Sequence, residues 1–160
     1  MQEIYVASHG EYAKGIVSAL SLLIGDDHGV TPVCGYCGDI SNTAELEQYQ
    51  ENVALLAAHR GNEVFLFTDM LGGSVNNTAI LVMMRHPQLH VIAGANLIML
   101  MEFCLSEEPA TASRITAAIA MATDGMCYVN RLPEIVLAAR SAAPGAPDHP
   151  DDFFTGGASS

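Results

Sequence analysis

The sequence predicts an α/β fold of three layers, in which a mostly parallel, doubly wound sheet has helices on both faces. Three observations predict it. Short β-prone segments alternate with longer segments of helical periodicity, as in βαβ units with right-handed crossovers. The apolar run Val64–Phe67 is uninterrupted, which is typical of a central parallel strand that is buried on both faces. Two strand segments end in polar, glycine-containing loops that lead directly into helices.

The first strand, first helix and second strand follow one another closely. Ile4–Ala7 is a short apolar, β-prone run, and Tyr12–Ile24 places apolar residues at helical spacing on one face. Gly25 ends that helix. Val30–Tyr36 is predicted as the second strand. Pro32 cannot donate a ladder hydrogen bond, so this strand lies at the sheet edge or begins after the proline.

A long second helix is predicted between a polar start and a glycine. Asn42 or Thr43 caps its first turn, and Gly61 follows basic residues in its last turn. The central strand Val64–Phe67 comes next. A third helix is expected over Val75–Arg85, closed by the histidine and proline that follow it.

The remaining segments continue the alternation. We expect a fourth strand over Leu89–Ala93, helices over Leu97–Leu105 and Ala110–Thr123, and a short late strand over Cys127–Val129.

Length and composition are those of a single globular domain. The chain has 160 residues, of which 50% are hydrophobic and 15% charged, so it buries a core rather than remaining disordered. We expect residues 1–140 to form the domain. Residues 141–160 are rich in Ala, Pro, Gly and Ser and are expected to form a flexible tail.

The charge of the chain excludes several partners. Six basic against eighteen acidic residues give a net charge of −12, which argues against nucleic acid and against docking on an anionic membrane surface.

The one lysine, Lys14, follows alanine, so there is no Walker A loop. The apolar stretch Ile16–Ile24 is too short to span a bilayer, and the first residues lack a basic signal-peptide region. We expect a cytoplasmic protein.

Two loops at the ends of predicted strands hold the candidate chemistry. His9 ends the first strand and Asp69 ends the central one, and each precedes a helix. In open α/β sheets, ligands bind beyond the carboxyl ends of the strands. If both strands lie near the centre of the sheet, His9 and Asp69 face each other there.

This arrangement suits a phosphoryl group. Helix N-termini offer free N–H groups to anions, and Gly10, Gly72 and Gly73 allow close approach of the backbone, while the Ser74 hydroxyl can add a hydrogen bond. A neutral imidazole is a competent nucleophile near pH 7. A carboxylate on one ring nitrogen leaves the other nitrogen free to attack phosphorus. Such transfer needs positioning and electrostatics rather than a metal of its own.

Three segments in order resemble the mannose-class IIA components of the bacterial sugar phosphotransferase system: Val6–Gly15, Phe67–Ser74 and Val91–Glu102. The likeness covers roughly residues 3–130, nearly the whole domain. It implies a phosphotransferase component in which His9 is phosphorylated, Asp69 orients it, and the loop at residues 72–74 contacts the phosphoryl group.

The resemblance also implies partners. The donor would be the phosphocarrier protein HPr and the acceptor a IIB component, with sugar uptake through membrane IIC and IID subunits that can hold this chain at the inner membrane. No IIB domain is seen within the sequence, so we expect it to be a separate chain. A homodimer is implied in which a late strand, Met126–Asn130, is exchanged. No cofactor is implied.

Two positions depart from the family pattern. Val75 and Ile98 stand where the family usually has proline. Proline at the first helical position preorganises a helix but is not chemically required, so we expect a looser loop rather than a lost activity.

Two other functions are weighed. A similar domain donates phosphoryl groups to dihydroxyacetone kinase. Alternatively, Cys34 and Cys37 form a CxxC that could serve thiol redox chemistry, although acidic surroundings disfavour a thiolate. Cys104 and Cys127 are isolated, so no metal site is predicted.

Met70 and Leu71 flank the proposed site, where an exposed apolar pair would suit successive docking partners.

Overall fold

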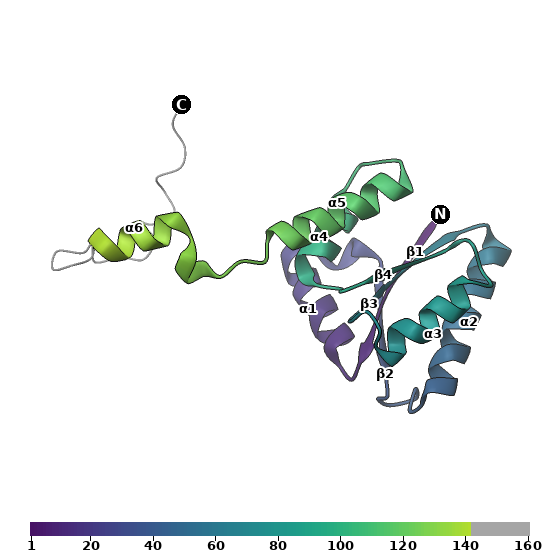
Figure 1. Ribbon diagram of the computed structural model, residues 1–160. Coiled ribbons are helices and arrows are strands. Elements are labelled where there is room, and N and C mark those ends of the chain that lie inside the picture. The colour runs from purple at the N-terminus through teal and green to yellow at the C-terminus, as the bar shows by residue number, and fades with distance from the viewer. Residues whose placement is uncertain (142–160) are drawn as a thin grey trace. The chain divides into compact units, whose positions relative to one another are not determined.

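The computed structural model describes residues 1–141 (Figure 1). Strands and helices alternate from the N-terminus to residue 93, and helices alone follow. The elements are β1 (Gln2–His9), α1 (Tyr12–Ile24), β2 (Val30–Gly35), α2 (Thr43–Arg60), β3 (Glu63–Thr68), α3 (Ser74–Met83), β4 (Leu89–Ala93), α4 (Leu97–Leu105), α5 (Thr111–Asp124) and α6 (Pro133–Ser141), with short 3₁₀ turns at Asp26–His28 and Val129–Arg131.

The strands of the described chain form one four-stranded sheet in the order β2-β1-β3-β4, and its three strand pairs are parallel. The chain moves outward from β1 to β2, then crosses back to β3 and continues outward to β4. The direction of winding therefore reverses between β1 and β3, which is where open α/β sheets bind ligands. Ala7 pairs with Thr68, so the next residues of both strands emerge side by side.

Helices cover both faces of the sheet, as predicted. One hydrophobic cluster joins the sheet to α1, α4 and α5, and a second joins it to α2 and α3 (Figure 1). Successive residues of β3 alternate between the two clusters: Phe65 and Phe67 belong to the first, Val64 and Leu66 to the second. A strand sandwiched in this way must be apolar at every position, which is why Val64–Phe67 is an uninterrupted apolar run.

Local signals predicted several element ends correctly. β2 is an edge strand, in which Pro32 lies opposite Val6 of β1. Because β2 has a neighbouring strand on one side only, the missing N–H of Pro32 disrupts no ladder on the other side. The side chain of Asn42 caps α2 by accepting a hydrogen bond from the Glu45 N–H at 3.0 Å. Gly61 ends α2 with φ 66°, a left-handed conformation that favours glycine.

The late strand predicted over Cys127–Val129 is wrong for the described chain. Residues 126–128 are irregular, and a 3₁₀ turn follows at Val129–Arg131. A strand requires hydrogen-bonded pairing with another strand, and none of the strand pairs within residues 1–141 includes this segment.

The last described helix, α6, was not predicted, although Pro133 at its first position and Glu134 in its first turn are ordinary helix-start signals. The described chain groups into two compact units, and the second begins at Met126. The boundary expected at residue 140 stays a prediction, and the expected tail lies, from residue 142, outside the described residues. None of the helices in residues 1–141 combines the length and apolar character that a membrane span requires.

Two leucines of α1 offer a matched test of the core. Leu20 is fully buried, whereas Leu22 is 87% exposed. We expect Leu20→Ala to lower the free energy of unfolding by about 2–5 kcal/mol, because it leaves a cavity. Leu22→Ala, the same change on the same helix, should change it by about 0.5 kcal/mol or less. Urea titration measures both, and equal losses would contradict the assignment of α1's inner face.

Candidate functional site

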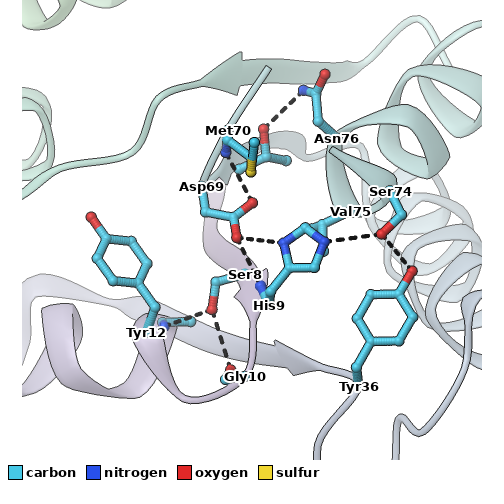
Figure 2. A network of polar contacts seen from close by, with 12 residues as sticks. Ser8, His9, Gly10, Tyr12, Tyr36, Asp69, Met70, Ser74, Val75 and Asn76 are labelled. Atoms are coloured by element: carbon cyan, nitrogen blue, oxygen red, sulfur yellow. Dashed lines mark hydrogen bonds and ion pairs between the residues drawn. The ribbon is translucent and has the colours of Figure 1, made fainter. Parts of the chain in front are cut away.

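His9 and Asp69 meet at the carboxyl ends of the two central strands (Figure 2). The Nδ1 atom of His9 lies 2.7 Å from Oδ2 of Asp69, and the same oxygen accepts the backbone N–H of His9 at 2.8 Å. A carboxylate only accepts hydrogen bonds, so Nδ1 is the protonated ring nitrogen. The expected juxtaposition of these two residues is therefore present, with Nε2 directed away from the carboxylate.

The Asp69 carboxylate is held from several sides. Its Oδ1 accepts the backbone N–H of Met70 at 2.9 Å, and its own backbone N–H donates to the Ala7 carbonyl across the strands. Burial acts to raise the pKa of Asp69, but the backbone N–H of His9, the His9 ring and the Met70 N–H outweigh it and hold the pKa below its ordinary value of 3.8. The carboxylate is thus ionised near neutral pH.

The opposite edge of the ring, at Nε2, meets Ser74, the first residue of α3. Nε2 of His9 lies 3.0 Å from Oγ of Ser74. The His9 side chain is 41% exposed and Asp69 only 15%, so solvent and a partner reach the imidazole while the carboxylate stays behind it. This combination places a nucleophilic nitrogen beside a hydroxyl, at the exposed carboxyl ends of the two inner strands.

The glycine loop before α3 is shaped by its neighbours. Gly72 adopts φ 79°, and its N–H donates to Oδ1 of Asn76, whose side-chain amide donates in turn to the buried Thr68 hydroxyl. A Cβ at Gly73 would lie 3.1 Å from Cε1 of His9, so a larger residue would press on the imidazole. The N–H of Asn77 donates to the carbonyl of Gly73, the N-cap of α3, so the N–H groups of Ser74, Val75 and Asn76 have no acceptor within the helix and lie in its first turn beside His9.

Gly10 forms the opposite side of the site. It adopts φ 56°, and its N–H donates to the Gly35 carbonyl at 2.9 Å. The preceding Ser8 hydroxyl accepts the Ala13 N–H at 2.7 Å and so holds the start of α1. The N–H groups of Gly10 and Gly72 are therefore already bonded within the protein, and these glycines shape the backbone rather than offer donors.

Sequence reasoning missed Tyr36, which lies beside His9 and Ser74 in the site (Figure 2). Its ring stacks on the His9 imidazole, with centroids 5.4 Å apart and planes inclined by 16°. Its hydroxyl donates to Oγ of Ser74 at 2.6 Å. The available signal was its position at the end of the predicted second strand Val30–Tyr36, although the observed strand ends one residue earlier, at Gly35.

The two positions that lack the family's proline are both second in their helices rather than first. Val75 follows Ser74 and is fully buried in the cluster beneath α3, so burial anchors the start of this helix. Ile98 follows Leu97 in α4, whose N-cap is Asn96. The expectation of a looser loop around Val75 finds no support in this packing.

Met70 and Leu71 are exposed at the rim of the site, 56% and 77% respectively. Cys34 on β2 and Cys37 in the following loop are free thiols. Within residues 1–141, no cluster of three or more His, Cys, Asp or Glu side chains could hold a metal ion.

Comparison with protein families shows which family the chain belongs to. The model of the EIIA-man family, described as the PTS system fructose IIA component, matches residues 3–120. The chain belongs to this family. It is a mannose-class IIA component of the sugar phosphotransferase system.

Individual relatives agree with this placement. The chain is 27% identical over 129 residues to the sorbose-specific EIIA component of Klebsiella pneumoniae, covering 81% of this chain and 92% of that protein. It is 25% identical over 161 aligned positions to the mannose-specific EIIAB component of Escherichia coli K12, covering 94% of this chain. That match takes in 49% of the Escherichia coli protein, so this chain spans about half of its length.

Solved structures show the same architecture. The PTS IIA protein associated with the fucose utilization operon of Streptococcus pneumoniae superposes with a TM-score of 0.68 at 25% identity, covering 81% of this chain and 94% of that one. The mannose/sorbose-specific IIA subunit of Enterococcus faecalis has a TM-score of 0.69 at 22% identity over 82% of this chain and 96% of its own, a likeness of fold.

The ionisation of Asp69 can be measured directly. We expect a ¹³C titration of its side-chain carboxyl in the folded protein to give a pKa below 3.8. In His9→Ala the ring contact is lost but the backbone N–H remains, so the pKa should rise part of the way. Because folding lowers this pKa, ionised Asp69 stabilises the folded state above pH 3.8, and that contribution is lost as the pH falls through the folded-state pKa. A wild-type pKa at or above 3.8 would contradict the hydrogen bonding described.

Proposed function

We propose that this chain is a phosphoryl carrier, which accepts a phosphoryl group from HPr on Nε2 of His9 and passes it to a IIB component. The observation that supports this most directly is the geometry of the His9 ring. Its Nδ1 is hydrogen-bonded to the Asp69 carboxylate, so Nε2 is directed away from that carboxylate, and the side chain is exposed at the carboxyl end of β1. Membership of the IIA family supports the reaction class.

The step forms one bond and breaks one. The Nε2 lone pair attacks phosphorus, the bond between phosphorus and the donor's leaving group breaks, and its electron pair departs with that group. The ring keeps its proton on Nδ1 and becomes cationic. Asp69, 2.7 Å away and ionised, stabilises that positive charge and keeps the ring in the reactive tautomer.

The start of α3 supplies the partners for the phosphoryl oxygens. The Ser74 hydroxyl already lies 3.0 Å from Nε2, where the phosphorus would be bonded. The N–H groups of the first turn, at Val75 and Asn76, and the positive end of the helix dipole favour an anion here. Gly73 has no side chain, so the phosphoryl group can approach this turn and the imidazole at once.

The proposed relay requires two partners, the donor HPr and the acceptor IIB component. Met70 and Leu71 are proposed as an apolar docking patch that HPr and the IIB component use in turn, since both must reach the same nitrogen. The acidic chain favours a donor with basic contacts.

We place the protein in the cytoplasm, next to the inner membrane when the IIC and IID subunits are engaged. Transfer to a dihydroxyacetone kinase would use the same chemistry, and an assay with each acceptor separates the two.

We also propose a homodimer in which residues 126–130 pair with the sheet of a second copy. Tyr128 has an extended backbone, with φ −88° and ψ 94°, and β4 has a strand beside it on one side only in the described chain. Sedimentation equilibrium of the full chain should give twice the 16.9 kDa of one copy. A single-chain mass at every concentration would contradict the dimer.

The phosphorylation site is tested by mass spectrometry after incubation with phosphorylated HPr. Wild type should gain one phosphoryl group that is labile in acid and stable in base, and His9→Ala should gain none. His59→Ala, which removes an exposed imidazole near the end of α2, serves as the matched control and should gain the group at the wild-type rate. Equal uptake by His9→Ala and wild type would reject the assignment.

Asp69→Asn extends the same series. It should keep the fold and slow transfer by at least about tenfold, since a hydrogen bond to a charged group contributes about 1.5–3 kcal/mol. An unchanged rate would remove Asp69 from the mechanism while leaving His9 in place.

A further inference from the structure

Tyr36 touches the reactive side of the site in two ways. Its ring lies against the His9 imidazole, and its hydroxyl donates to Ser74, the residue that faces Nε2 (Figure 2). A third contact places its oxygen 3.0 Å from Oγ1 of Thr43, the first residue of α2. The phenol therefore links the starts of two helices to the imidazole.

The direction of these hydrogen bonds is set by proton count. A phenol has one proton, and here Tyr36 gives it to Ser74, so Thr43 must donate to the phenol oxygen. Ser74 accepts from Tyr36 and has its own proton left. In the neutral ring, Nδ1 is protonated toward Asp69 and Nε2 is a lone pair, so Ser74 donates to Nε2.

Phosphorylation changes what the Ser74 proton meets. Once Nε2 is bonded to phosphorus its lone pair is gone, and the nearest acceptor becomes a phosphoryl oxygen. The lone pair of Ser74 that faces Tyr36 remains occupied throughout. Ser74 is thereby kept as a donor toward whatever stands at Nε2, before and after transfer.

The backbone at Tyr36 is consistent with a constrained role. It is the one non-glycine residue of the described chain with a positive φ, at 60°. A bulky side chain in this region is conformationally strained, and such strain persists where surrounding contacts hold it. Here those contacts are the stacked imidazole and the two hydroxyls, all at the site itself.

We propose that Tyr36 is a positioning residue for phosphoryl transfer: its hydroxyl keeps the Ser74 proton directed to the reacting side of His9, where the proton passes from the Nε2 lone pair to a phosphoryl oxygen as the bond to phosphorus forms, and its ring fixes the plane of the imidazole. This inference rests on the proposed function and extends it to a residue outside the three sequence segments that identify the family. It predicts that the hydroxyl acts through Ser74 rather than on the phosphoryl group directly.

The first test needs no phosphate. Tyr36→Phe keeps the stacked ring and removes the hydroxyl, and ¹⁵N NMR of the His9 imidazole then reports the hydrogen bond at Nε2. We expect the Nε2 resonance to move in the same direction as in Ser74→Ala, because a serine that no longer accepts from a phenol is a weaker and less directed donor. The control Tyr12→Phe removes a hydroxyl that bonds the Ala95 carbonyl and should leave the resonance unchanged.

The second test is a double-mutant cycle on the rate of transfer from phosphorylated HPr. We expect Tyr36→Phe to slow transfer about twofold to tenfold, the range that one hydrogen bond contributes. In the Ser74→Ala background the same change should have no further effect, since the bond it removes is already gone. Equal losses in both backgrounds, as a merely structural role predicts, would overturn the proposal.

The two tests separate this inference from the proposed function. If wild type takes up no phosphate, the proposed function fails, and the imidazole spectrum still decides whether Tyr36 acts on Nε2. If wild type is phosphorylated while Tyr36→Phe shows an unchanged Nε2 resonance, the proposed function stands and Tyr36 has no positioning role.

Discussion

One carboxylate oxygen sets the geometry of this protein's site. Oδ2 of Asp69 accepts both the ring Nδ1 and the backbone N–H of His9, so it holds the side chain and the main chain of the same residue at once. The contact joins positions sixty residues apart and exists only because β1 and β3 are neighbours whose carboxyl ends are level. Tautomer, ring orientation and charge stabilisation all depend on this contact.

The sheet provides the rigidity that this contact requires. β1 and β3 are the two inner strands, and apolar side chains enclose them on both faces, so neither end can shift without disturbing a core. The helices that follow these strands then begin at the site. The side chain of Val75, the second residue of α3, is fully buried and fixes the start of that helix beside His9. The hydrophobic layers thus determine where the polar groups meet.

Most of the elements were predictable because their signals are local. Apolar spacing, the Asn42 cap and the glycine at position 61 depend on neighbours a few residues away, and the structure agrees with them. The late strand predicted over Cys127–Val129 does not form within the described chain, because strand formation requires a partner strand that a local pattern cannot supply. Tyr36 was missed for a related reason: the local pattern made it the last residue of the second strand, whereas that strand ends at Gly35 and Tyr36 turns into the following loop with a left-handed backbone.

By itself, the sequence determined the α/β class, the order of elements and the two loops in which His9 and Asp69 stand, since these follow from periodicity and composition. It also determined the family, through three short segments in order. Only the tertiary structure decided which nitrogen of His9 is presented, and that Ser74 and Tyr36 share its open side. Those facts depend on distances between separate strands and loops, which arise from packing the sheet and are not encoded in any single stretch of chain.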